Sequence, residues 1–179
     1  MVALGQTAAA YAARTALAAV ALLVVLFWER KRFTFKSVSF FDFFIGVFVG
    51  LIVLAIWIAP ALNLPKVSDS PYSPANCGLG YFLLKLFGSA FVISAAEELF
   101  FRRFLIKFAG FWPMVALFAV EHNVYPTGWY WGITVGALAG LFYGVLYLKR
   151  GLFPAIVAHA TTNLALGIYV VCCDQWQFW

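Results

Sequence analysis

The sequence is 179 residues long, and 65% of it is hydrophobic, 20% is aromatic and only 11% is charged. Soluble domains carry about 25% charged residues, so this composition excludes an ordinary soluble domain and predicts an integral membrane protein. A net charge of +5 could indicate nucleic-acid binding, but the basic residues stand at the ends of apolar runs, where they report membrane topology. We therefore expect the lipid bilayer, and no nucleic acid, as a partner.

Apolar runs predict an all-α, polytopic helix bundle in a single membrane domain covering residues 1–179, with its active site inside the bundle. About six hydrophobic segments are expected, at 6–28, 43–59, 80–108, 111–122, 129–148 and 152–173. Proline and serine residues predict a loop at 61–79, and Pro126 to Gly128 predict a turn. The aromatic tail at 175–179 suits a membrane–water interface.

Basic residues predict the orientation of these segments. Eight fall on one side of the membrane in this reading, and only Lys66 falls clearly on the other; the eight are Arg30, Lys31, Arg32, Lys36, Arg103, Lys107, Lys149 and Arg150. Cytoplasmic loops carry an excess of lysine and arginine, so the side with the eight is predicted to be cytoplasmic. Both termini are then expected outside the cytoplasm.

Two adjacent acids, Glu97 and Glu98, stand in the third apolar segment. Acidic residues within a membrane are expensive and usually mark function. Glu98 and Arg102 are one helical turn apart and can form an ion pair. Glu97 lies about 100° around the helix from Glu98, so it is left available for chemistry. The alternative is an ion pair that only stabilises helix packing.

Three further polar residues, His122, His159 and Asn163, stand in membrane-like sequence and complete the candidate set. A rise of about 1.5 Å per residue places Glu97 and the two histidines in one layer, in the cytoplasmic half of the bilayer. His159 and Asn163 lie one turn apart on the same helix face. These side chains could hydrolyse an acyl bond, hold a metal or form a proton relay.

The motifs Glu97-Glu98-x-x-x-Arg102, Phe118-x-x-x-His122 and His159-x-x-x-Asn163 occur in this order on membrane segments. In this they resemble the CAAX prenyl endopeptidase family of glutamic-type intramembrane proteases, also called the CPBP or Abi family. The motif core is expected at about 80–173. The chain's ending, from His159 to the aromatic tail, is similar to bacterial CAAX protease-related proteins associated with exosortase systems.

The resemblance implies an intramembrane endopeptidase of a bacterial inner membrane, with a membrane-associated protein or peptide as substrate. Glu97 and His122 would activate a water, His159 and Asn163 would hold the oxyanion, and Glu98 and Arg102 would support them. Neither a metal nor another cofactor is expected. Two alternatives stay open: a non-enzymatic immunity or scaffold protein on the same fold, and a metal-dependent intramembrane protease.

Overall fold

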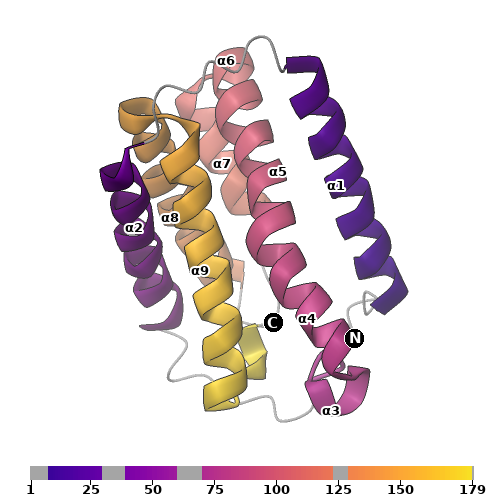
Figure 1. Ribbon diagram of the computed structural model, residues 1–179. Helices are drawn as coiled ribbons and strands as arrows, with labels where there is room; N and C mark the ends of the chain where they lie inside the picture. Colours follow the sequence, from indigo (N-terminus) through magenta and orange to yellow (C-terminus); the bar gives the residue numbers. More distant parts are fainter. Residues whose placement is uncertain (1–7, 30–38, 60–69, 123–128, 179) are drawn as a thin grey trace.

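The computed structural model describes residues 8–29, 39–59, 70–122 and 129–178, and all regular structure in these ranges is helical (Figure 1). This confirms the predicted all-α membrane bundle. The separate helices are α1 (Ala8–Glu29), α2 (Phe40–Ile58), α3 (Pro74–Cys77), α7 (Phe111–Glu121), α8 (Trp129–Arg150), α9 (Leu152–Cys173) and the short 3₁₀ helix η4 (Trp176–Phe178).

The helix that carries the paired acids runs without a break from Leu79 to Ala109. Its five parts are α4 (Leu79–Phe87), η2 (Gly88–Ile93), α5 (Ser94–Glu98), η3 (Leu99–Leu105) and α6 (Ile106–Ala109). The parts η2 and η3 are π-helical. The sequence predicts the helix but not these wider turns, which are rare and occur frequently at functional sites.

Within the described ranges, four helices are long and apolar enough to cross a membrane, namely Phe40–Ile58, Leu79–Ala109, Gly132–Arg150 and Leu152–Cys173. Helices α1 and α7 add shorter apolar stretches, Ala10–Val25 and Phe111–Glu121. At a rise of about 1.5 Å per residue, α7 measures about 17 Å, which is too short to cross a hydrocarbon core of about 30 Å. Helix α7 alone therefore cannot cross the membrane.

Large apolar side chains cover the outside of the bundle. Phe40, Phe48 and Phe108 are 78%, 65% and 82% exposed. A soluble protein rarely exposes so much apolar surface, whereas lipid chains are as apolar as these side chains. This surface and the long apolar helices together identify an integral membrane protein.

Three basic residues of the described helices lie at one end of the bundle. Helices α6 and α8 end at the upper end in Figure 1, so Lys107, Lys149 and Arg150 lie together there. Cys77, in α3, lies at the opposite end. Five of the basic residues used for orientation and the turn expected at 126–128 lie outside the described residues; the five are Arg30, Lys31, Arg32, Lys36 and Lys66.

Glycines let the helices approach closely along two contacts. A Cβ atom added at Gly46 would lie 2.8 Å from Pro154 O, and one added at Gly50 would collide with Ala158 O, so α2 and α9 pack almost backbone to backbone. On α8, Gly136 faces the backbone of Ala119 on α7, and Gly140 and Gly144 make room for the rings of Phe118 and Phe111. Small residues four positions apart are a common basis of helix packing in membranes.

The structure corrects one expectation for an irregular segment and adds detail to another. Pro74–Cys77, expected in a loop, forms α3, because Ser73 caps its first turn and Pro74 suits the first helical position. The side chains of the aromatic tail pack into the bundle instead of covering its surface: Trp176 and Phe178 are only 6% and 7% exposed.

The tail is buried because Asp174 adopts a left-handed conformation (φ 53°) at the end of α9 and reverses the chain. The Gln175 N–H then donates to Val170 O at 3.0 Å. Trp176 and Phe178 pack against Val170, with Trp57 of α2 beside them. Aromatic residues fill a core as well as an interface, so composition alone did not separate the two.

We expect Gly50→Ala to destabilise the bundle by about 1–3 kcal/mol, because its Cβ meets the backbone of Ala158, which cannot move without shifting α9. The matched control is Gly80→Ala, since an added Cβ there meets nothing within 4 Å. Thermal unfolding in detergent measures both variants. Equal melting temperatures for Gly50→Ala and wild type would contradict the close packing of α2 on α9.

Candidate functional site

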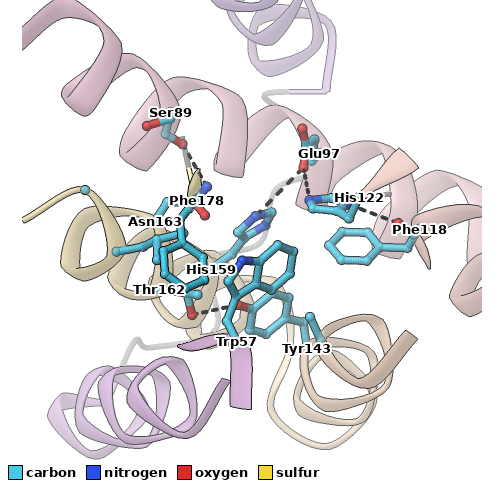
Figure 2. A pocket seen from close by; sticks show the side chains of 13 residues that line it. Trp57, Ser89, Glu97, Phe118, His122, Tyr143, His159, Thr162, Asn163 and Phe178 are labelled. Carbon is cyan, nitrogen blue, oxygen red and sulfur yellow. Dashed lines mark hydrogen bonds and ion pairs between the residues drawn. The ribbon is translucent and has the colours of Figure 1, made fainter. Parts of the chain in front are cut away.

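A cavity of about 180 Å³ lies inside the bundle (Figure 2). We call it the central cavity. Its lining residues belong to α2, η2, α5, α7 and its C-cap, α8, α9 and η4. They are Trp57, Ser89, Glu97, Phe118, His122, Ala139, Tyr143, His159, Thr162, Asn163, Leu166, Gly167 and Phe178. Four of the residues singled out from the sequence, Glu97, His122, His159 and Asn163, thus line the same cavity.

One carboxylate oxygen of Glu97 faces both histidines (Figure 2). Its Oε2 lies 3.4 Å from Nε2 of His122 and 3.8 Å from Nε2 of His159. The Glu97 side chain is 14% exposed, so it is accessible from the cavity without being open to bulk solvent. The common depth estimated from the sequence is therefore matched by a direct convergence of three side chains.

Hydrogen bonds fix which nitrogen of each histidine carries its proton. Nδ1 of His122 lies 3.0 Å from the carbonyl oxygen of Phe118, which can only accept. Nδ1 of His159 lies 2.9 Å from the carboxylate of Glu98. Both Nδ1 atoms therefore donate, which turns both Nε2 atoms toward Glu97.

Aromatic rings hold the two imidazoles in place. The His122 ring stacks on Phe118 with centroids 4.0 Å apart, and the His159 ring stacks on Tyr143 at 5.0 Å. Tyr143 is itself fixed, because its hydroxyl donates to Thr162 Oγ1 at 2.6 Å. Neither histidine can turn without disturbing the packing of a buried ring.

Glu98 and Arg102 form the ion pair expected from their spacing, with Glu98 Oε1 3.1 Å from Arg102 Nη1. Both side chains are fully buried. The guanidinium also lies 4.2 Å from the centre of the Phe118 ring and donates to Gly140 O at 3.4 Å. Since the same Glu98 oxygen accepts from His159, the pair positions a residue of the central cavity.

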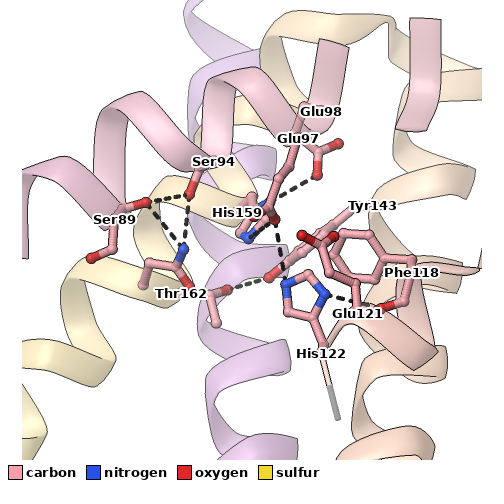
Figure 3. A network of polar contacts seen from close by, with 12 residues as sticks. Ser89, Ser94, Glu97, Glu98, Phe118, Glu121, His122, Tyr143, His159 and Thr162 are labelled. Carbon is pink, nitrogen blue, oxygen red and sulfur yellow. Dashed lines mark hydrogen bonds and ion pairs between the residues drawn. The ribbon is translucent and has the colours of Figure 1, made fainter. Parts of the chain in front are cut away.

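Asn163 makes contacts that its sequence motif did not reveal (Figure 3). Its amide nitrogen donates to Ser94 Oγ at 2.9 Å and to the carbonyl oxygen of Ser89 at 3.2 Å. Ser94 Oγ also donates to Ser89 O, across the π-helical turn η2. In this structure Asn163 therefore secures η2 with both amide protons while lining the cavity.

Two charged residues, which belong to no motif, lie near Glu97 but outside the central cavity. Arg14 of α1 has its Nη2 3.9 Å from Glu97 Oε1 and 3.7 Å from Glu121 Oε1. The three charged residues also line a second cavity of about 470 Å³, on the α1 side of Glu97. The signal available in the sequence was Arg14 itself, a charge within an apolar segment that needs a counter-ion.

Glu97, His122 and His159 could also hold a metal ion, since one ligand atom from each lies within 4.8 Å of the others. Ligands of a tetrahedral zinc ion are about 3.4 Å apart. The Glu97–His122 distance of 3.4 Å fits this value, and the Glu97–His159 distance of 3.8 Å is longer. Histidines with Nδ1 bound to a carbonyl or carboxylate are typical of metal sites.

Comparison with known families identifies the central segment. Residues 79–165 match the family described as type II CAAX prenyl endopeptidase Rce1-like. The chain contains an Rce1-like domain. The matched segment reaches from α4 into α9 and includes every residue placed at the site from the sequence motifs. The matched family implies CAAX-type intramembrane protease activity. Comparisons with curated proteins and with solved structures found no match.

We expect Glu98→Ala to lower the free energy of unfolding by about 3–5 kcal/mol, because it leaves the Arg102 guanidinium buried without a counter-ion. Glu98→Leu combined with Arg102→Met should recover part of this loss, since no charge then stays buried. Thermal unfolding in detergent measures both, with the partly exposed Glu121→Ala as control. A Glu98→Ala protein as stable as wild type, beside an unfolded Glu97→Ala, would show that the roles of the two acids are reversed.

Proposed function

We propose that this Rce1-like protein hydrolyses a peptide bond of a membrane-associated protein or peptide, using a water activated in the central cavity. The observation that carries the proposal is the convergence of Glu97 Oε2 with Nε2 of His122 and of His159. Glu97 is the acid left free by the Glu98–Arg102 pair. A base, its partner and hydrogen-bond donors are the parts that hydrolysis of an acyl bond requires.

The proposed reaction forms no covalent intermediate with the enzyme. A water held between Glu97 and His122 attacks the substrate carbonyl carbon while Glu97 takes its proton. The carbonyl oxygen becomes an oxyanion, and His159 in its imidazolium form would donate to it from Nε2. Collapse of the tetrahedral intermediate breaks the C–N bond, and the proton held by Glu97 passes to the leaving amine.

Asn163 is the second proposed oxyanion donor, although its amide protons are used in the present geometry. An oxyanion would have to replace the bond to Ser89 O, the longer of the two at 3.2 Å. Ser89 O would keep the hydrogen bond from Ser94, so no buried carbonyl would lose its only partner. The exchange is therefore compatible with an intact η2.

A metal-bound water is the second candidate mechanism. Two observations favour it. Each histidine has its Nδ1 bonded to a carbonyl or carboxylate oxygen, and Glu97 Oε2 lies 3.4 Å from His122 Nε2, the spacing of two zinc ligands. Glu97, His122 and His159 would then be the ligands, and the metal would lower the pKa of the bound water. Asn163 is a poor zinc ligand and would have no direct part in such a site.

We expect Glu97→Gln and His122→Ala to reduce hydrolysis of a prenylated CAAX peptide to near background, because each removes part of the base. Glu121→Gln, an acid near Glu97 but outside the central cavity, is the matched control and should retain activity. Activity of the wild type should survive chelators. Stoichiometric zinc, with activity lost on chelation and restored by zinc alone, would establish the metal mechanism instead. Full activity of Glu97→Gln would exclude both mechanisms.

Asn163→Ala should lower kcat by about 10²–10³-fold, the usual effect of removing an oxyanion donor. Ser94→Ala is the matched control, because it removes the Asn163 hydrogen bond to Ser94 Oγ but keeps the amide and its bond to Ser89 O. Steady-state rates and melting temperatures are measured for both. Similar small rate losses in the two variants would mean that Asn163 only secures η2.

The non-enzymatic alternative is tested by trapping. An inactive Glu97→Gln protein should retain its substrate in membranes, where mass spectrometry can identify it. Recovery of a peptide or protein above an empty-membrane control supports the protease. If no partner is recovered and no CAAX peptide is cleaved by the wild type, an immunity or scaffold role on the same fold is favoured.

The end of the bundle that carries Lys107, Lys149 and Arg150 is proposed to face the cytoplasm of a bacterial inner membrane, because cytoplasmic ends carry an excess of basic residues. In a protein with Cys172 and Cys173 replaced by alanine, Cys77 at the other end should react with an impermeant maleimide in intact cells. With Cys77 also replaced, Lys107→Cys should react only after lysis. The reverse pattern would invert the proposed orientation.

A further inference from the structure

A second apolar site lies away from the central cavity, between α2 and α8. It is a groove of about 400 Å³. Its walls are Ile45 and Val49 of α2 and Leu141, Phe142, Val145 and Leu146 of α8, and Lys149 and Arg150 stand at one end. Ala139 and Tyr143 of the same helix line the central cavity instead. Helix α8 therefore separates two sites of different character.

The groove has the length of one lipid chain in one leaflet. From Leu141 to Arg150, a rise of about 1.5 Å per residue gives about 14 Å, close to half of a hydrocarbon core of about 30 Å. Val145 on its wall is 36% exposed, so the groove is open at the surface of the bundle. An acyl chain could enter it directly from the bilayer.

Charge at the end of the groove selects the kind of lipid. Lys149 and Arg150 are both exposed in the last turn of α8. The Arg150 guanidinium lies 3.6 Å from Asp42 Oδ1 and 5.2 Å from the centre of the Phe41 ring. Asp42 offsets one of the two cations, which leaves one net positive charge and several N–H donors beside the groove.

We propose that this groove binds an anionic phospholipid. One acyl chain lies between α2 and α8, and the phosphate lies against Lys149 and Arg150. Basic residues between membrane helices commonly bind anionic head groups, and the apolar walls supply the rest of the contact. The lipid would also fill the space beside Ile45 and Val49, which pack against the main core of the bundle.

The test uses the whole protein, delipidated in neutral detergent. Melting temperature and lipids retained in native mass spectrometry are measured with phosphatidylglycerol, with phosphatidylcholine of the same chains, and with glycerol phosphate. Lys149→Gln removes the charge and is matched by Lys107→Gln, an exposed lysine at the same end outside the groove. Val145→Trp fills the groove and is matched by Leu148→Trp, which is 58% exposed and does not line it.

Phosphatidylglycerol should stabilise the wild type more than phosphatidylcholine does, and glycerol phosphate should not stabilise it. Lys149→Gln should weaken phosphatidylglycerol binding by about five-fold, the attraction of one basic residue near a membrane surface. Val145→Trp should abolish stabilisation by both lipids, and both controls should behave as wild type. Equal binding of the two lipids, unchanged binding by Lys149→Gln, or tighter binding of a neutral isoprenoid alcohol than of phosphatidylglycerol would overturn the proposal. If Val145→Trp does not fold, Lys149→Gln alone decides.

Discussion

The buried contact of Glu98 with Arg102 and His159 is the interaction on which the site depends. A carboxylate without water or a partner is unstable in an apolar interior, and Glu98 is fully buried. One of its oxygens is held by a guanidinium at 3.1 Å and by an imidazole at 2.9 Å. Three helical segments, α5, η3 and α9, are thereby tied together at one point. Glu97, the preceding residue, points into the cavity because Glu98, about 100° away around the helix, points to this contact.

The π-helical turns leave backbone groups that need hydrogen-bond partners inside the bilayer, and side chains provide them. A wider turn changes the hydrogen bonds of the helix, and the hydrocarbon supplies no water to replace them. Ser89 O, in η2, accepts from Ser94 and from Asn163. Helix α5, with both acids, thus lies between two wider turns. In the first of these turns, the Ser89 carbonyl receives its hydrogen bonds from side chains. The hydrogen bonds that complete the wider turn also hold α5, and with it Glu97, in place.

Hydropathy and spacing predicted most of the fold and named the central side chains, because both follow from helix periodicity. The Glu98–Arg102 pair follows from a four-residue separation, and the common layer of Glu97, His122 and His159 follows from the rise per residue. Spacing also indicates where helices pack closely: Gly46 and Gly50 are four residues apart, as are the successive glycines of α8.

Other features depend on contacts between distant segments, which periodicity does not encode. The commitment of Asn163 to η2 needs Ser89 and Ser94 from another helix, about seventy positions away in the chain. Arg14 reaches Glu97 and Glu121 only because α1 lies beside η2 and α5. The packing of the aromatic tail into the bundle could not be predicted, since it depends on one left-handed residue, Asp174, and on the space beside Trp57.

Helix packing and site geometry are linked through Thr162. Its hydroxyl lies 2.8 Å from Gly50 O on α2 and accepts from Tyr143, which stacks on His159. Thr162 reaches the α2 backbone because Gly50 leaves no side chain between α2 and α9. The position of His159, and hence its 3.8 Å distance from Glu97, therefore depends on a glycine that touches no reacting atom. In a membrane bundle without a hydrophobic driving force between helices, close backbone contacts of this kind both hold the fold and set the dimensions of the site.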